Sequence, residues 1–264
     1  MKAACKLTTA VGGLMLVQSA LGLLFREQYR DVDWIAATWF GNDWATLAIA
    51  FPLLAIGLTW TKRGSVRALL LWLGTLAYAV YNYAYYLFGA ALNAFFPLYA
   101  AALITSTLAL ILALFAISPA DISDRFEENT PVRLIGGYFI CVGVTLAGIW
   151  LGMWAAHVFA GRPTPIEPEA FKLVAALDTV LIVPALASGG VLLWRRNAWG
   201  YVVAAITGVQ SSLYLLVLSI NSIVFVARDL ADWPGEIPIW TSLAAATSLA
   251  TVLLFANAER RLEV

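Results

Sequence analysis

The residues most able to do chemistry are polar side chains inside long apolar stretches. Asp178 lies six residues after Lys172 in one such stretch, which on a helix places it roughly 9 Å deeper. No Lys, Arg or His occurs at comparable depth in the other stretches. An ionisable group at mid-membrane costs roughly 2.5–3.5 kcal/mol. We therefore predict that Asp178 couples to protons or anchors a cationic or hydroxylated ligand. The structural alternative is a carboxyl that is hydrogen-bonded to a neighbouring helix or hydrated from outside.

A second polar cluster lies between residues 81 and 93. Counted along a helix from Arg67, Asn82 is roughly 22 Å from one membrane face, which is the level of Asp178. Tyr81 and Tyr85 share a helix face. The alternative to a pocket is an interfacial tyrosine belt with an asparagine that locks two helices together. The residues predicted to line a small polar pocket are Asp178, Asn82, Tyr81, Tyr85 and Asn93.

The counts of metal-binding and nucleophilic residues exclude several kinds of site. The chain has one histidine, His157, and two cysteines, Cys5 and Cys141, without a C-x-x-C motif. A haem held by two histidines, a His-rich metal site and a thiol redox centre are therefore disfavoured. Phosphate-loop, nucleophile-elbow and H-E-x-x-H patterns do not occur. We expect no cofactor, and the residues favour a protein that is not an enzyme.

The composition points to an integral membrane protein. Of 264 residues, 62% are apolar and only 12% are charged, with 16 basic and 16 acidic residues. A disordered chain needs low hydrophobicity, a nucleic-acid binder normally has a basic surplus, and a soluble domain this apolar would expose aggregating patches. The predicted partners are the lipid bilayer, a small-molecule ligand, and a second copy or a membrane subunit, with no nucleic acid.

The elements that must position these side chains are membrane-spanning helices. A span needs roughly 20 mostly apolar residues, and the runs are long and Leu/Ala-rich rather than alternating. We predict an all-α, multi-pass helix bundle in the cell membrane, whose first span is retained rather than cleaved as a signal peptide. The eight predicted spans are 7–25, 44–61, 68–90, 94–118, 134–158, 172–194, 199–226 and 238–257.

The distribution of Lys and Arg predicts the orientation of the spans. The loops on the side of the N-terminus carry 11 of the 16 basic residues, Arg260 and Arg261 among them, and the opposite side carries five. Nine acidic residues, including Asp43, fall on that opposite side. Because positively charged loops stay in the cytoplasm, we predict that both termini are cytoplasmic.

The two halves of the chain share a pattern of landmarks. A glycine pair is followed by an Asp, an intramembrane Pro and an aromatic-plus-basic turn, with Asp43 and Pro52 in one half and Asp178 and Pro184 in the other. We predict a parallel duplication of a four-helix unit, with Asn221 in the counterpart of the Asn82 layer. The predicted units are 1–118 and 134–264, joined by a cytoplasmic linker at 119–133. The alternative is that such landmarks occur in every multi-pass protein.

Two further segments carry predictions about packing. Gly148 and Gly152 form a G-x-x-x-G motif, which permits close approach of helices. The segment 33–40 contains Trp34 and Trp39 with apolar residues between them. That pattern predicts a segment lying on the membrane surface, where it would cap a pocket.

Two stretches resemble a family of uncharacterised bacterial and archaeal multi-span membrane proteins. One runs from Tyr81 to Gly89 and continues from Asn93 to Tyr99; the other contains Leu177–Asp178, Pro184 and the residues 193–201. Together they cover about a fifth of the chain. The resemblance implies a multi-span architecture and no particular chemistry.

Taken together, the residues favour a small-solute permease, or a ligand-binding membrane protein, with an outward-facing polar pocket. The alternative is a non-catalytic accessory or scaffold subunit of a membrane complex. A lipid-modifying enzyme is disfavoured because no acid–base or metal constellation is visible.

Overall fold

The computed structural model describes residues 1–258, so that Arg260 and Arg261 lie outside the described residues. These residues form helices and short connections, which confirms the predicted all-α class. The first half contains α1 (Lys2–Leu24), a 3-10 turn η1 (Arg26–Gln28), α2 (Asp33–Ala45), a π-helical turn η2 (Thr46–Ala50), α3 (Phe51–Thr61), α4 (Val66–Gly89) and α5 (Phe96–Leu114). The short α6 (Pro119–Ser123) follows. The second half contains α7 (Val132–Ala160), α8 (Pro168–Leu177), a π-helical turn η3 (Asp178–Ile182), α9 (Val183–Trp194), α10 (Ala198–Ala227) and α11 (Ile237–Ala256).

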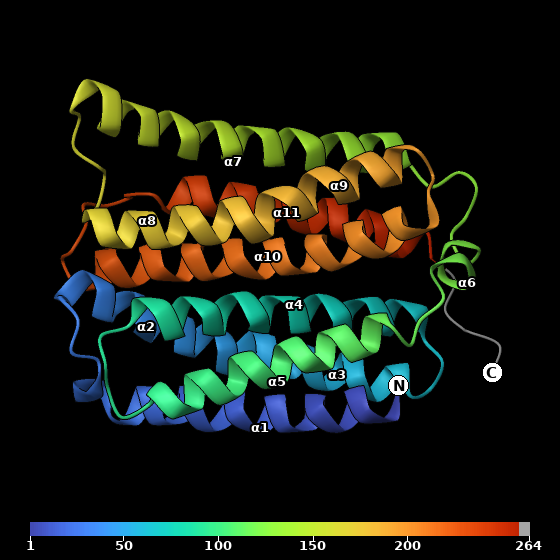
Figure 1. Ribbon diagram of the computed structural model, residues 1–264, viewed down its shortest axis with the longest axis horizontal. Coiled ribbons are helices and arrows are strands. Elements are labelled where there is room, and N and C mark those ends of the chain that lie inside the picture. The colour runs from blue at the N-terminus through green and yellow to red at the C-terminus, as the bar shows by residue number, and fades with distance from the viewer. Residues whose placement is uncertain (259–264) are drawn as a thin grey trace.

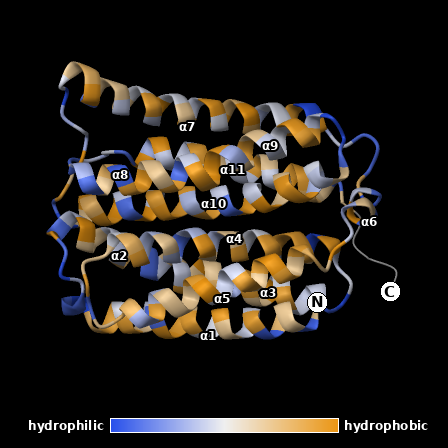
Figure 2. Ribbon diagram, in the orientation of Figure 1, coloured by the Kyte–Doolittle hydropathy of each residue, from blue (hydrophilic) through white to orange (hydrophobic). Residues whose placement is uncertain are grey.

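Seven continuous helices within residues 1–258 are long and apolar enough to cross a membrane. They are α1, α2–η2–α3, α5, α7, α8–η3–α9, α10 and α11. Figure 2 shows apolar residues along their lengths and polar residues gathered at the two ends of the bundle. The protein is therefore a multi-pass membrane protein whose environment is a lipid bilayer.

The remaining predicted span, 68–90, corresponds to α4, which does not reach the same apolarity. The reason is its position, because 17 of its 24 residues are buried among other helices. A helix surrounded by protein can carry tyrosines and asparagine that lipid would not tolerate. Its N-terminus is capped by Ser65, whose hydroxyl accepts a hydrogen bond from the Ala68 amide at 3.3 Å.

The helices run along one common axis, with α4 and α10 side by side at the centre (Figure 1). The helices α1, α3 and α5 lie on the side of α4, whereas α7, α9 and α11 lie on the side of α10 (Figure 1). Gly74 of α4 allows this central contact, because a Cβ there would lie 2.5 Å from the Val209 Cβ of α10. In addition, α2 packs on α10, and α8 packs on α4, across the middle of the bundle.

The prediction that the segment 33–40 lies on the membrane surface is wrong, because this segment begins a continuous helix that is long and apolar enough to cross a membrane. The run from Asp33 to Thr61 is one continuous helix of 29 residues. Trp39 is 1% exposed and stacks on Tyr86 of α4 with ring centroids 4.8 Å apart. Burying an indole ring between helices yields more packing area than leaving it on the membrane surface, so the segment turns into the bundle.

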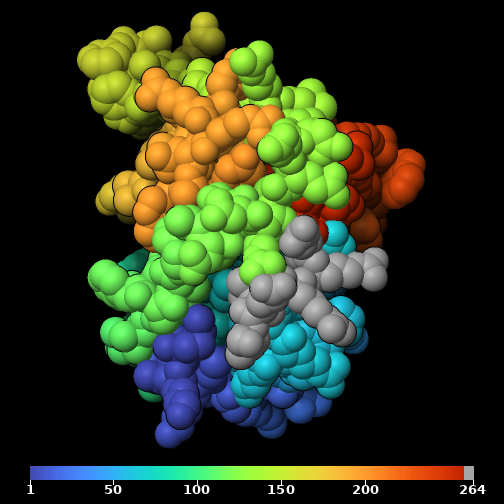
Figure 3. All heavy atoms as spheres, turned by 90° about the vertical axis from the view of Figure 1, so that its right-hand side faces the viewer, coloured from blue at the N-terminus to red at the C-terminus, as the bar shows by residue number. Residues whose placement is uncertain are grey.

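The end of the bundle that holds the start of α1 and the end of α11 is closed by contacts between the halves. Figure 3 shows this end, where the linker around α6 lies between the two halves. Arg67 Nε donates to the Ala258 carbonyl at 2.9 Å, and the Glu127 amide donates to the Asn257 carbonyl at 2.9 Å. These bonds satisfy carbonyls at the C-terminal end of α11, which would otherwise lack partners.

The G-x-x-x-G motif of α7 does not mediate packing within the described residues. A Cβ added to Gly148 or Gly152 would meet nothing within 4 Å. The close contacts of α7 are made instead by Gly136 and Gly143, against Gly190 and Leu186 of α9. The prediction of close approach at Gly148 and Gly152 is therefore wrong for this chain alone.

Candidate functional site

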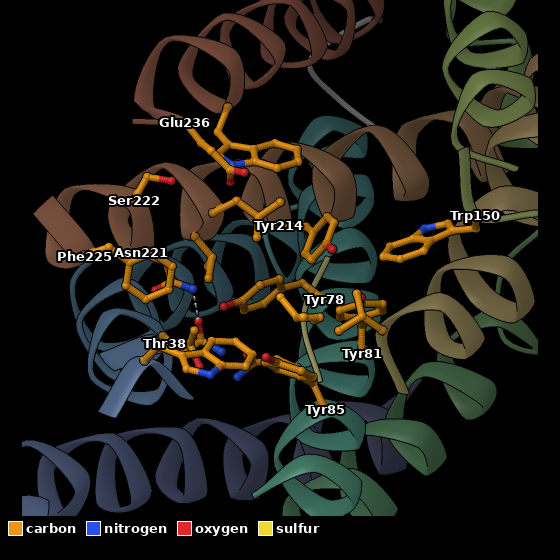
Figure 4. A pocket seen from close by; sticks show the side chains of 18 residues that line it. Thr38, Tyr78, Tyr81, Tyr85, Trp150, Tyr214, Asn221, Ser222, Phe225 and Glu236 are labelled. Atoms are coloured by element: carbon orange, nitrogen blue, oxygen red, sulfur yellow. Dashed lines mark hydrogen bonds between the residues drawn. The ribbon is translucent and has the colours of Figure 1, made fainter. Parts of the chain in front are cut away.

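A cavity of about 230 Å³ lies between the two halves, toward the end of the bundle opposite α6. Its wall is built from α2, α4, α7, α8 and α10, with the loop before α8 and the start of α11 (Figure 4). Aromatic rings and small polar side chains dominate this wall. The lining residues are Trp34, Thr38, Asn42, Tyr78, Tyr81, Asn82, Tyr85, Trp150, Ile166, Val174, Tyr214, Val217, Leu218, Asn221, Ser222, Phe225, Glu236 and Trp240.

Asp178 lies directly behind this wall. It is 1% exposed, at the first residue of the π-helical turn η3. The Tyr81 hydroxyl donates to its carboxylate at 2.6 Å, Trp150 Nε1 donates at 3.0 Å, and the Tyr214 hydroxyl donates at 3.5 Å. These donors come from three helices of both halves and satisfy the carboxylate, which could not otherwise be buried at low cost. Each donor lines the cavity, so that Asp178 is one hydrogen bond away from it.

Two asparagines of the wall have amide atoms without a hydrogen-bond partner. They are the Asn82 Nδ2 on α4 and the Asn221 Oδ1 on α10, in residues that are 3% and 5% exposed. The Asn221 Nδ2 donates to the Asn42 Oδ1 at 3.1 Å, the bond drawn in Figure 4. Gly41 makes this contact possible, because a Cβ there would overlap the Asn221 Oδ1. Buried polar atoms are normally satisfied, and these two amide atoms, in residues that line the cavity, are exceptions.

The sequence-predicted residues are brought together with one exception. Tyr81, Asn82 and Tyr85 line the cavity, and Asp178 is bonded to Tyr81 behind it. Asn93 lies apart, in the connection between α4 and α5, where its Oδ1 accepts a hydrogen bond from the Phe95 amide at 2.8 Å. The short connection makes this asparagine a turn residue. It does not line the cavity.

The structure contains a second buried carboxylate, Asp43, which the sequence did not predict to be buried. It is fully buried and accepts hydrogen bonds from Gln18 Nε2 at 2.9 Å, the Tyr29 hydroxyl at 2.6 Å and the Tyr86 hydroxyl at 2.8 Å. Burial raises the pKa of the Tyr29 phenol far above its usual value, so this group keeps its proton and donates a hydrogen bond to Asp43. Gly22 leaves the space for the carboxylate. The available signal was the match of Asp43 and Asp178 in the repeat pattern.

The residues around the opening of the cavity are acidic on balance. Glu236 is part of the wall, and its carboxylate accepts a hydrogen bond from Trp240 Nε1 at 2.8 Å. A neighbouring groove shares Trp34 and Tyr85 with the cavity and contains Glu167, Glu169 and Lys172. The ammonium of Lys172 lies 3.5 Å from the Glu169 carboxylate. Within residues 1–258, no three His, Cys, Asp or Glu side chains form a group that could hold a metal ion.

Comparison with known proteins finds no matching family model, no matching curated protein and no matching solved structure. The resemblance of the segments around Tyr81 and Asp178 to a membrane-protein family is supported only in its architecture, that of a multi-pass helical protein.

Proposed function

We propose that the protein is a small-solute permease, or a ligand-binding protein of the cell membrane, whose ligand occupies the cavity between the two halves. The observation that carries this proposal is the pair of buried amide atoms, Asn82 Nδ2 and Asn221 Oδ1, that lack partners in the wall of this cavity. An amide nitrogen and an amide oxygen recognise a small molecule with complementary polar groups, while the rings around them bury its apolar parts.

We further propose that the chain is a duplicated four-helix unit, with units at 1–118 and 134–264. Support comes from residue pairs that are 132 positions apart. The π-helical turns begin at Thr46 and Asp178, and each ends two residues before a proline. A Cβ at Gly57 would lie 2.9 Å from the Trp72 amide nitrogen, and a Cβ at Gly189 would lie 3.1 Å from the Ala204 amide nitrogen. A shift of 132 residues therefore converts the α3–α4 contact of the first half into the α9–α10 contact of the second half.

The cavity lies where these equivalent positions meet. Asn82 and Tyr214 are 132 positions apart and both line it, as do Tyr85 and Val217. A pseudo-twofold axis through the cavity is the arrangement in which duplicated transporters bind their substrates between repeats. The spacing of 132 residues pairs Asp178 with Thr46 and not with Asp43, which the landmarks of the sequence had matched to it. The carboxylate therefore breaks this symmetry. We propose that Asp178 is the group that couples the second half to protons or orients the solute.

The π-helical turn at Asp178 supports this role. A π-helical turn replaces the regular i to i−4 hydrogen bonds and is common at functional sites. Pro184 follows it and supplies no backbone N–H. The backbone between Asp178 and Pro184 is therefore held less firmly than a regular helix, which would allow α8 to move relative to α9.

We propose that the end of the bundle with α6 faces the cytoplasm, so that the cavity opens outward. In the described residues, nine Lys and Arg side chains belong to this end and five to the other. The basic residues at the α6 end are Lys2, Lys6, Lys62, Arg63, Arg67, Arg125, Arg133, Arg195 and Arg196. Such a bias is the strongest determinant of orientation.

The test measures which solutes accumulate in cells that express the full chain. The cells are incubated with a cell extract that is uniformly labelled with ¹³C. Mass spectrometry of the washed cells should reveal one or more labelled solutes that accumulate with the wild type and not with an empty vector. Asp178→Asn should abolish this accumulation while the variant inserts normally, because the substitution removes the charge behind the cavity wall and keeps its shape.

Asp43→Asn is the matched control, because Asp43 is equally buried and has three donors outside the cavity. It should retain accumulation. If Asp178→Asn accumulates the same solutes as the wild type, the coupling role of Asp178 is wrong. If wild-type cells accumulate nothing beyond the vector cells, the permease role is wrong.

A further inference from the structure

The cavity wall has no positive charge. Among the described residues that line it, none is Lys, Arg or His, and the one charged residue is Glu236. An anionic ligand would lose its hydration without gaining a counter-charge, which costs several kcal/mol in a site of low polarity. The wall therefore selects against anions.

Three strong hydrogen-bond donors of the wall are already committed to Asp178. Tyr81, Trp150 and Tyr214 point their O–H or N–H groups at Asp178. Because these donors serve a carboxylate, they are not offered to a ligand, and the hydrogen bonds push electron density onto the donor rings. What remains for a ligand is the unpartnered Asn82 amide nitrogen and Tyr78 hydroxyl, together with the negative faces of the rings. Tyr81 and Tyr214 both line the cavity and meet edge to face with ring centroids 5.0 Å apart.

Cations bind to aromatic faces, and best where several faces converge. Tyr85 and Trp34, both from the first half of the chain, add two further aromatic rings to the cavity wall. Glu236 at the opening and Asp178 behind the wall add negative potential from two directions. The loops and first helical turns around the opening hold eight acidic and five basic residues in addition to the buried Asp43. This surplus raises the local concentration of cations at the opening.

The chemistry of the cation follows from the cavity itself. An inorganic divalent ion needs several oxygen ligands at short distance, and the described residues contain no cluster of three carboxylate, thiol or imidazole groups. A volume of about 230 Å³, with eight aromatic residues among the 18 that line it, fits instead a compact organic cation with apolar substituents.

We propose that the ligand is a small organic monocation, a tertiary or quaternary ammonium, held by the aromatic wall of the cavity between α4 and α10. This proposal rests on the proposed function of the cavity and names the chemical class of its ligand. The Asn82 and Asn221 amides then bind a polar substituent of that cation, such as a hydroxyl.

The experiment compares three molecules of nearly the same shape and different charge. They are choline, the neutral 3,3-dimethylbutan-1-ol and the anionic 3,3-dimethylbutanoate. Binding to the purified full chain in lipid nanodiscs is followed by the fluorescence of the tryptophans, three of which line the cavity. We expect choline to bind about tenfold or more tightly than the neutral alcohol, as desolvated cation–π contacts imply, and the anion not to bind.

Two variants locate the selectivity. Asp178→Asn should reduce the preference for choline over the alcohol several-fold, whereas the matched Asp43→Asn should leave it unchanged. Glu236→Gln keeps an acceptor for Trp240 and lies in an exposed position, so it provides a second charge variant that folds. It should also weaken choline binding, and more so at low ionic strength.

The outcomes separate the ligand class from the function. A neutral alcohol or an anion that binds as well as choline would overturn the cation proposal and leave a ligand-binding cavity. Failure of all three molecules to bind also overturns the cation proposal, and the accumulation of labelled solutes then decides separately whether the cavity transports another class.

Discussion

Asp178 and Asp43 are both fully enclosed carboxylates, and their donors decide what each can do. The donors of Asp43 are Gln18, Tyr29 and Tyr86, none of which lines the cavity. Asp43 therefore fastens α1, the following loop and α4 to α2. The three donors of Asp178 all line the cavity. Under the proposed function, a change in the charge of Asp178 would reach a ligand in the cavity through a single layer of side chains.

Gly41 is the residue whose substitution should disturb the cavity most directly. In Gly41→Ala the new methyl group would overlap the Asn221 Oδ1 and separate the Asn42–Asn221 pair. Overpacking of this kind costs about 1–3 kcal/mol. We expect a lower thermal unfolding temperature of the purified protein. Gly148→Ala is the control, since a Cβ there meets nothing within 4 Å. Equal unfolding temperatures for Gly41→Ala and the wild type would contradict the close contact.

At the scale of the elements, the two broken helices α2–η2–α3 and α8–η3–α9 are the parts that place the carboxylates. In each of them a five-residue π-helical turn is followed by a helix that begins with proline at its second position. Pro lacks the N–H that a regular helix would need there, so the irregular turn and the proline accommodate each other. The part of each broken helix after the proline packs on the next helix along the chain. Gly57 of α3 contacts α4, and Gly189 of α9 contacts α10.

These two packing glycines should respond in parallel to substitution. Gly57→Ala brings a methyl group to 2.9 Å from the Trp72 amide nitrogen, and Gly189→Ala brings one to 3.1 Å from the Ala204 amide nitrogen. Backbone atoms cannot move aside as a side chain does, so both variants should lose about 1–3 kcal/mol of stability, with the larger loss for Gly57→Ala. Chemical denaturation in mixed micelles measures this. Gly13→Ala, with open space around it, should be neutral; losses confined to one of the two halves would argue against equivalent contacts.

At the scale of the whole molecule, the two ends of the bundle differ, because the halves are bonded to each other at the end with α6 and the cavity between them lies toward the other end. At the end with α6, Arg67 of α4 binds the end of α11, and Arg196 Nη2 donates to the Glu128 carbonyl of the linker at 2.9 Å. At the opposite end, the Cζ atoms of Arg26 and Arg228 lie 4.2 and 4.6 Å from the centroid of the Phe40 ring. These two contacts join a loop of the first half to a loop of the second half. The cavity therefore lies near the end of the bundle opposite α6.

The orientation prediction is tested by labelling single cysteines in intact cells. In a chain with Cys5 and Cys141 replaced by Ser, Asp232→Cys lies in the exposed loop near the cavity and Asn129→Cys in the exposed linker. A membrane-impermeant maleimide should label Asp232→Cys directly and Asn129→Cys only after permeabilisation, because Lys and Arg hold the α6 end in the cytoplasm. The reversed pattern would place the cavity on the cytoplasmic side.

The amino-acid sequence by itself determined the environment and the helices of this protein. Long apolar runs specify membrane helices because each backbone polar group must be bonded within its own segment. The same reasoning identified Asp178, Tyr81, Asn82 and Tyr85, since polar groups are rare and costly within such runs.

Only the tertiary structure decided which polar groups meet. Asp43 reads as a residue of an outer loop, yet the helix continues inward to Asp33 and buries its carboxylate. Asn93 was predicted to line the same pocket as Asn82, but its Oδ1 instead accepts a hydrogen bond from the Phe95 amide in a turn. Trp34, Asn42 and Trp150 reach the cavity from α2 and α7, segments far from α4 in the chain. Spacing along one helix fixes which residues share a face, but the neighbour of that face depends on how separate helices pack, and that information resides in contacts between distant parts of the chain.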